Sequence, residues 1–331
     1  MRPTIVVTGG AGYIGSHVTL ALRDQDWPVL VVDNLECGDA SLVPDGVEFF
    51  NADCGDADRM LALFAKHQVH AVMHLAASTL VPESVVDPMK YYLNNAVSTA
   101  NLIDSCIRSN VGVFIYSSTA AVYGNARGSG RVSEEEPPRP ITPYGKSKLM
   151  GEEMLADAAS AHPFRYIALR YFNVAGADPA GRSGQSNPNA THLVSVACQT
   201  AVGARAYMET YGNDYDTPDG TCVRDYVHVS DVADAHTAAL EHLMRGAESG
   251  VFNCGYGHGH SVLDVVAAVR LVSGADICVR EASRRPGDVP ELVCSARRIR
   301  ETLGWAPKHD QLSTIVQTAY DWECRQRDGT T

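Results

Sequence analysis

The chain has 331 residues, a formal net charge of −12 at pH 7 and 45% hydrophobic residues. This composition is typical of an acidic globular protein, and the length suffices for one large α/β unit with a smaller lobe. No basic stripe occurs along the sequence, which argues against nucleic acid or an anionic membrane surface as the main partner.

Cysteine usage and the apolar runs indicate a compartment. The nine cysteines are scattered without C-x-x-C pairs, which favours reduced thiols over a disulfide framework or a zinc site. No stretch approaches ~20 uninterrupted apolar residues, and Met1 to Thr4 lead directly into a predicted strand, which leaves no room for a signal peptide. The histidines have no metal-ligand spacing, and His258 and His260, which alternate with glycines, are expected on the surface. We expect a cytoplasmic protein without a metal.

A glycine-rich turn follows the first predicted strand, residues 5–7. Gly9, Gly12 and Gly15 have the spacing G-x-x-G-x-x-G, and helical apolar spacing begins near Ser16. Between a strand and a helix, such glycines let the backbone approach a pyrophosphate, and the helix N-terminus adds N–H donors and a positive dipole. The turn therefore predicts a dinucleotide site.

The second predicted strand, residues 29–32, ends at Asp33. A carboxylate at that strand end accepts hydrogen bonds from both ribose hydroxyls and repels a 2′-phosphate. No arginine follows closely, so the sequence predicts NAD rather than NADP. The alternative is that Asp33 only caps a helix or forms a turn before Asn34.

Further strands and helices alternate up to about residue 175. Strands are predicted at 47–50, 70–75, 113–116 and 167–170, and helices at 58–67 and about 88–109. This alternation predicts an α/β fold with a Rossmann-type doubly wound parallel sheet. The glycine- and proline-rich stretch 124–143 is expected to be a surface loop, with the acidic run 134–136 as a solvated cluster.

The pattern becomes less regular from about residue 178, where glycine and proline loops separate short helices. This change predicts a smaller, mixed lobe that closes over the first. We expect an NAD-binding domain at 1–177 and a substrate lobe at 178–331, with an approximate boundary and with interleaving of the two as an open alternative.

Tyr144 and Lys148 lie four residues apart in a predicted helix, so both side chains lie on one face. An unperturbed tyrosine titrates near pH ~10, and service as a base at neutrality needs a shift of about three units, or roughly 4 kcal/mol. A nearby ammonium and the positive nicotinamide ring of an oxidised cofactor favour the phenolate. Without the glycine turn, a solvated helix face would be the simpler interpretation; with it, the pair is predicted to be catalytic.

Hydroxyl groups follow the predicted strand 113–116, at the end where open sheets bind ligands. A hydroxyl there can bond a sugar oxygen and share a proton with Tyr144. For Ser117 and Ser118, satisfying a backbone group at the strand end is an equally ordinary role. Thr119 is the better catalytic candidate because of the resemblance described next.

In these motifs the chain resembles the extended short-chain dehydrogenase/reductase family, and within it the UDP-glucose 4-epimerases. The resemblance covers nearly the whole chain, and its most specific runs lie at 170–173, 211–215, 219–229 and 284–288. One departure is Thr79, where many of these epimerases carry a lysine in the loop after the fourth strand. One basic contact to the cofactor is therefore in doubt here.

The resemblance implies a mechanism. Tyr144 as phenolate removes the proton of the sugar 4-hydroxyl while C4 gives a hydride to NAD. The 4-keto sugar then turns over and receives the hydride on its other face, which inverts C4. Lys148 would hold the nicotinamide ribose and lower the pKa of Tyr144, and Thr119 would bridge the phenol and the sugar. NAD is regenerated in each turnover and is expected to stay bound.

The resemblance also implies the binding residues. NAD would be held by Gly9, Gly12, Tyr13, Ile14, Gly15, Asp33, Asn34, Asp53, Cys54, Leu75, Ala76, Ala77, Asn95, Tyr144, Lys148 and Phe172. The UDP-sugar would contact Thr119, Asn173, Tyr211, Arg224, Arg285, Asp288 and Leu292. A guanidinium forks onto phosphate oxygens, so both arginines suit the diphosphate, although either alone would more often be a surface ion pair. Related enzymes pair through the long helix at 88–109 and the Tyr144 helix, so a homodimer is expected.

Three functions stay open, with C4 epimerisation of UDP-glucose and UDP-galactose as the leading one. The second is another UDP-sugar enzyme, either an epimerase of N-acetylated sugars or a 4,6-dehydratase. Dehydratases place an acidic pair after the Ser/Thr, where this chain has Ala120 and Ala121, which have no proton to exchange. The third is a non-catalytic NAD-binding protein, which a lost tyrosine or lysine would favour.

Leu292 is the position expected to limit the sugar. In the resembled family, tyrosine at this place leaves room only for a hydroxyl at C2, whereas a smaller residue can admit an N-acetyl group. Leucine is intermediate, so some activity on UDP-N-acetylglucosamine is expected beside the hexose pair. The alternative is that Leu292 only packs against the second lobe.

Overall fold

The structure is a computed structural model that describes residues 3–125, 131–187, 190–285 and 287–329. Within these residues, seven parallel strands form one sheet in the order β12-β7-β5-β4-β1-β2-β3. Their bounds are β1 Thr4–Thr8, β2 Val29–Asp33, β3 Glu48–Asn51, β4 Val69–His74, β5 Val113–Thr119, β7 Arg165–Tyr171 and β12 Gly250–Cys254. The strand order reverses between β1 and β4, and open sheets bind ligands at such a point. The predicted doubly wound parallel sheet is confirmed.

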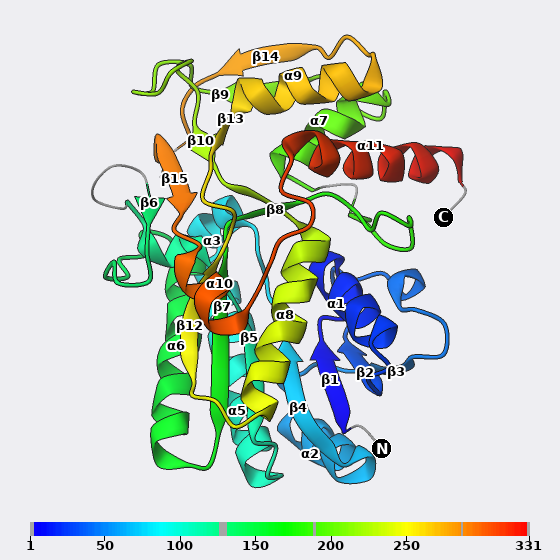
Figure 1. Cartoon of the computed structure of the whole chain (residues 1–331), viewed down its shortest axis with the longest axis vertical. Helices are drawn as coiled ribbons and strands as arrows, with labels where there is room; N and C mark the ends of the chain where they lie inside the picture. Colours follow the sequence, from blue (N-terminus) through cyan, green and yellow to red (C-terminus); the bar gives the residue numbers. More distant parts are fainter. Residues whose placement is uncertain (1–2, 126–130, 188–189, 286, 330–331) are drawn as a thin grey trace.

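The central strands are apolar because both faces of the sheet are covered. In β1, Ile5 and Val7 point to one face and Val6 to the other, and all three are fully buried. Helices α1 (Tyr13–Asp24) and α8 (Val229–Met244) cover the first face, and α2 (Ala57–His67), α5 (Ser98–Arg108) and α6 (Pro143–Ala161) cover the second (Figure 1). The 3-10 turns η1 (Ala40–Leu42) and η3 (Ala120–Tyr123) follow β2 and β5.

The predicted long helix at 88–109 is not one α-helix. After α3 (Val81–Val86) it consists of α4 (Pro88–Tyr91), the π-helical segment η2 (Tyr92–Val97) and then α5. Asn95, a predicted cofactor residue, lies in the π segment and is 1% exposed. Such segments often occur at functional sites because they redirect side chains locally.

The second half builds smaller sheets above the carboxyl ends of the large sheet in Figure 1. A four-stranded mixed sheet has the order β13-β10-β15-β6, and β11 pairs with β8 and β14 with β9. The strands are β6 Arg131–Val132, β8 Asn173–Ala175, β9 Met208–Tyr211, β10 Val223–Arg224, β11 Tyr226–His228, β13 His260–Ser261, β14 Val279–Ala282 and β15 Glu291–Cys294. The helices are α7 Leu193–Ala201, α9 Val262–Ser273, α10 Arg297–Leu303 and α11 Leu312–Asp328.

Three local expectations need correction. The predicted surface loop 124–143 contributes β6 to the mixed sheet, although its residues 126–130 lie outside the described part of the chain. Within the acidic run, Glu134 accepts a hydrogen bond from the Asn253 backbone N–H at 2.7 Å, so this residue is not simply solvated. His258 and His260 are half-buried, and His260 lies in β13.

Segments after residue 177 return to the large sheet. α8 packs on α1, and β12 pairs in parallel with β7 at the sheet edge. The division of the chain into two domains near residue 177 stays a prediction. No helix among the described residues has the length and apolarity needed to cross a membrane.

Candidate active site

The glycine turn between β1 and α1 is closely packed against backbone. Gly9 has φ +71°, and a Cβ there would lie 2.5 Å from the backbone nitrogen of Ala76. A Cβ on Gly15 would lie 2.0 Å from the Gly9 carbonyl oxygen. α1 begins at Tyr13 after Gly12, which has no side chain to cap the helix. The first-turn N–H groups and the cradle without side chains fit a pyrophosphate.

Asp33 ends β2 and is 8% exposed. Its Oδ2 accepts a hydrogen bond from Ala11 N at 3.0 Å, and its Oδ1 accepts one from Leu35 N at 2.9 Å. The bond to Leu35 is the turn contact that was the alternative role for Asp33. The carboxylate oxygens keep further lone pairs that can accept hydrogen bonds from a ligand. A Cβ on Gly38 would lie 2.9 Å from Oδ1, so the absence of a side chain there lets this segment pack closely against the carboxylate. The glycine turn and this carboxylate together fit NAD.

Other predicted cofactor residues have structural contacts of their own. The Asn95 side chain accepts from Ser78 N at 2.8 Å and donates to the Ser78 carbonyl at 2.9 Å and to Ser147 Oγ at 3.1 Å. It thereby ties the segment after β4 to α6. Tyr13 donates its hydroxyl to the Gly176 carbonyl at 2.6 Å.

The remaining cofactor candidates differ in burial. Phe172 and Cys54 are buried, whereas Asp53, Asn34 and Thr79 are exposed, and Leu75, Ala76 and Ala77 are half-buried. Ile14 is a half-buried residue of α1 that packs on the core. All of these positions stay predictions for NAD contacts.

The three predicted catalytic residues lie on two adjoining elements. Thr142 caps α6, its Oγ1 accepting a hydrogen bond from Gly145 N at 3.2 Å, and this places Tyr144 in the first turn. Lys148 follows one turn later, 1% exposed, with Nζ 4.8 Å from the centre of the Tyr116 ring. Thr119 ends β5, and its side chain lies close enough to Tyr144 to lower the pKa of the phenol. The structure therefore brings Thr119, Tyr144 and Lys148 to one place.

Burial governs the protonation of this group. It raises the pKa of Tyr144 above its ordinary value of 10.0, and the hydrogen bond from Thr119 opposes the rise. Burial also lowers the pKa of Lys148 to about 7, opposed by the negative charge of Glu152. The lowered tyrosine pKa expected from Lys148 is therefore not a property of the protein alone. In the protein alone, burial therefore favours the phenol form of Tyr144 and brings the pKa of Lys148 down toward the neutral range.

Four of the predicted substrate residues form a second group: Tyr211, Arg224, Arg285 and Asp288. Asp288 lies between two arginines, with its Oδ2 accepting from Arg285 Nε at 3.0 Å and its Oδ1 3.9 Å from Arg224 Nη2. The Arg285 guanidinium lies 4.5 Å from the centre of the Tyr211 ring. Leu292 on β15 is in register with Arg224 on β10, and it packs half-buried against the core. Asn173, half-buried, begins β8 and is in register with Tyr226 of β11.

Sequence reasoning missed Glu152. It lies one turn after Lys148 on α6 with a 5% exposed side chain, and it forms a bidentate ion pair with Arg170 of β7. The available signal was its place in the stripe Tyr144, Lys148, Glu152, because residues four apart share a helix face. A carboxylate on a face directed into the sheet needs a partner.

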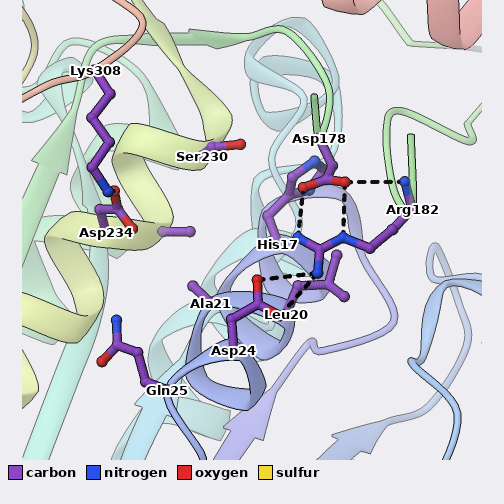
Figure 2. A pocket seen from close by; sticks show the side chains of 11 residues that line it. His17, Leu20, Ala21, Asp24, Gln25, Asp178, Arg182, Ser230, Asp234 and Lys308 are labelled. Carbon is purple, nitrogen blue, oxygen red and sulfur yellow. Dashed lines mark hydrogen bonds and ion pairs between the residues drawn. The ribbon is translucent and has the colours of Figure 1, made fainter. Parts of the chain in front are cut away.

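A separate pocket lies beside α1 and α8 (Figure 2). Arg182 there bonds Asp178 and Asp24 at 2.9 Å, and Lys308 bonds Asp234 at 2.7 Å. None of the predicted catalytic, cofactor or substrate residues lines this pocket.

Comparison with known proteins adds a family to this geometry. The model of the NAD dependent epimerase/dehydratase family matches residues 5–255. A UDP-glucose 4-epimerase of Azospirillum brasilense is 53% identical over 97% of this chain and 92% of its own. The crystal structure of UDP-glucose 4-epimerase from Brucella ovis in complex with NAD is 41% identical with a TM-score of 0.93, covering 97% of this chain and 98% of the other. The UDP-Glc/GlcNAc 4-epimerase of Campylobacter jejuni is 46% identical with a TM-score of 0.85, covering 98% and 99%.

Proposed function

This chain belongs to the NAD dependent epimerase/dehydratase family, and we propose that it is an NAD-dependent enzyme that inverts C4 of a UDP-hexose, interconverting UDP-glucose and UDP-galactose. The observation that carries the proposal is the meeting of Thr119, Tyr144 and Lys148 at the carboxyl end of β5, on the edge of the parallel sheet that also carries the glycine turn. A hydroxyl, a phenol and an ammonium there can move a proton on and off a sugar hydroxyl.

The protein's own groups handle the proton. When bound, NAD supplies a reversible hydride acceptor for C4 and a positive charge beside the phenol. Tyr144 takes the proton of the 4-hydroxyl in one direction and returns it in the other. Thr119 bridges the phenol and the sugar oxygen. Lys148 supports the phenolate only in its charged form, and burial brings its pKa to about 7.

The substrate residues hold the nucleotide rather than the sugar. Arg224 and Arg285 offer forked N–H donors to the diphosphate, and Asp288 orients both arginines and accepts from a ribose hydroxyl. Because these groups bind the part of the substrate that does not react, the 4-keto sugar can turn over while the nucleotide remains attached.

Two alternatives differ in their support. Dehydration across C5 and C6 needs an acid–base pair after Thr119, and Ala120 and Ala121 have no ionisable group. Activity on N-acetylated UDP-sugars is favoured by Leu292, whose side chain lacks the length of a tyrosine. We include it as a secondary activity. A non-catalytic NAD-binding role is disfavoured because Tyr144 and Lys148 are both present and together.

Incubation of purified protein with UDP-galactose and no added cofactor tests the function. UDP-glucose should appear, without a deoxy-keto sugar and without net NADH, because NAD is carried by the enzyme and regenerated. A deoxy-keto product would establish a dehydratase instead. Retained NAD with no conversion of any UDP-sugar would establish the non-catalytic role.

We also propose a homodimer formed through α3, α4, η2 and α6. Large apolar side chains are exposed along these elements, with Val86 at 87%, Met89 at 59%, Leu93 at 57% and Val97 at 48%. They follow one another along α3, α4 and η2, and Met150 on α6 adds a 41% exposed side chain. An apolar strip of this kind is typical of a protein–protein contact.

Light scattering at micromolar concentration tests the dimer. Leu93→Glu should convert a dimeric mass to a monomeric one, because a charge in the contact loses its water. Leu271→Glu is the control, since Leu271 is 84% exposed on α9, away from the strip. A monomeric mass for the unmodified protein would contradict the proposal.

We place the protein in the cytoplasm. All nine cysteines are free thiols, which favours a reducing compartment. Titration of the unfolded, non-reduced protein from its native host should give nine thiols; a smaller number would indicate disulfides and contradict this location.

A further inference from the structure

Glu152 is a buried carboxylate to which the proposed mechanism gives no role. It is the next residue after Tyr144 and Lys148 on the same face of α6. Its Oε1 accepts from Arg170 Nε at 2.9 Å and its Oε2 from Arg170 Nη2 at 2.6 Å. Ser118, next to Thr119 on β5, also donates its hydroxyl to Oε1. These donors compensate the burial of the negative charge and fix the carboxylate in one orientation.

The network continues to the turn that follows Thr119. Arg170 Nη1 donates to the Tyr123 hydroxyl at 2.8 Å, and its guanidinium lies 4.8 Å from the centre of the Tyr123 ring. Tyr123 in turn donates to Asn253 Oδ1 at 2.7 Å. Because Tyr123 ends η3, the turn begun at Thr119, the network joins the element that carries Thr119 to the helix that carries Tyr144 and Lys148.

Glu152 also acts on the charge of Lys148. The titratable groups that face Lys148 or interact with its charge come from four parts of the fold: Cys54 after β3, His74 of β4, Tyr116 of β5, and Tyr144 and Glu152 of α6. Burial lowers the pKa of His74 to about 3 and raises that of Cys54 to about 12, so both are uncharged at neutral pH. Glu152 is therefore the group in this set that supplies a negative charge, and the Arg170 guanidinium of β7, paired with it, offsets part of that charge.

We propose that Glu152 is a positioning residue for epimerisation, which favours the charged form of the buried Lys148 amine and, through Arg170 and Ser118, fixes Thr119 relative to Tyr144. This inference rests on the proposed function for its kinetic consequence. Its electrostatic part concerns the protein alone. Loss of the Glu152 charge lets Lys148 deprotonate at lower pH, and a neutral amine gives less support to the Tyr144 phenolate.

Glu152→Gln tests the proposal because it removes the charge and keeps the size. The alkaline limb of the kcat–pH profile should move about one unit toward lower pH, the ordinary effect of a nearby charge. At pH 8, kcat should fall about tenfold, while KM for the UDP-sugar stays unchanged because Glu152 lies away from Arg224, Arg285 and Asp288. A purely structural role would lower the amount of active enzyme without moving the limb.

Glu323→Gln is the matched control. Glu323 is a 7% exposed glutamate on α11 that accepts from Gln199 Nε2 at 3.1 Å, outside the catalytic group. The Glu323→Gln variant should keep the kcat–pH profile of the parent. Because Glu152→Gln leaves Arg170 buried without its partner, the double variant Glu152→Gln/Arg170→Met removes both charges and is expected to fold. Because it removes a pair of opposite charges, its alkaline limb should move toward lower pH by less than that of Glu152→Gln.

A second readout separates the two proposals. The pKa of the Lys148 ammonium can be followed by NMR of lysine-labelled protein, with Lys148→Met to assign the signal. It should be about one unit lower in Glu152→Gln than in the parent, and displaced by less in the double variant. An unchanged lysine pKa would overturn this inference whatever the activity, whereas a parent that epimerises no UDP-sugar would overturn only the proposed function.

Discussion

The catalytic group and the substrate group place their charges in different surroundings. Lys148 is 1% exposed and the Glu152 side chain 5%, and both lie against the large sheet. The side chains of Asp288 and Arg285 are 22% and 46% exposed, and they pair with each other at the edge of the smaller lobe. Buried charges with fixed partners keep one arrangement throughout a reaction.

Half-exposed ion pairs contribute little to stability and can open at low cost. Asp288 accepts a hydrogen bond from Arg285 and forms a longer ion pair with Arg224, so a diphosphate that binds these arginines competes with a carboxylate already present. The comparison teaches that the proposed proton-handling groups are held in one arrangement by burial, whereas the proposed nucleotide-binding groups can exchange partners.

Removal of the proposed base, Tyr144, should have the largest effect on turnover. The change lies within the buried catalytic group. Tyr144→Phe keeps the ring and removes the hydroxyl, so fold and NAD content should persist while kcat falls at least about a hundredfold, the low end for loss of general acid–base catalysis. Product formation followed under saturating UDP-galactose measures it. Near-normal turnover would remove Tyr144 from the mechanism.

The cofactor end of the buried catalytic group is tested by Asp33→Ala. Loss of a charged acceptor should weaken NAD binding by roughly ten- to a hundredfold and relax discrimination against NADP. Cofactor content after gel filtration and binding titrations measure both. Asp39→Ala, a carboxylate that caps η1 after the same strand, is the control and should retain NAD. Undiminished NAD retention in Asp33→Ala would show that another group holds the ribose.

Substitutions in the substrate group should change substrate binding rather than turnover. Arg224→Ala should raise KM for UDP-galactose about tenfold or more with little change in kcat, because a charged hydrogen bond to the diphosphate is lost. Arg284→Ala is the neighbouring control, since Arg284 pairs with Asp214 at 2.7 Å instead of Asp288. If Arg224→Ala lowered kcat by as large a factor as it raised KM, the division between the catalytic group and the substrate group would be wrong.

The smallest effect is expected for Leu292, the residue predicted to limit which sugar is accepted. Leu292→Tyr should suppress activity on UDP-N-acetylglucosamine while sparing the hexose pair, because a phenol fills the space beside C2. The ratio of the two activities, measured on one preparation, is the relevant quantity. Equal loss of both activities, or no N-acetyl activity in the parent, would show that Leu292 only packs against the lobe.

The large sheet was predictable because its strands are apolar on both faces and are punctuated by glycines and Asp33. The π segment η2 was not, because its exposed residues Leu93 and Val97 continue an ordinary helical spacing. β6 has only two residues and therefore shows no period. Prediction of the site has the same limit, because motifs are local in sequence. They indicate Tyr144 and Lys148, whereas the partner of Glu152 comes from β7 and is visible only in the folded chain.

The position of β12 bears on how the chain is made. β7 receives its outer neighbour only after residues 250–254 have been synthesised, well after the glycine turn and Tyr144 have left the ribosome. Until then, β7 is an open sheet edge with unpaired backbone groups, the kind of edge that recruits other strands. A fragment that stops near residue 177 would keep this edge permanently and should aggregate, even though it contains every predicted catalytic residue. The nascent protein thus contains its predicted catalytic residues before the edge of its large sheet is covered.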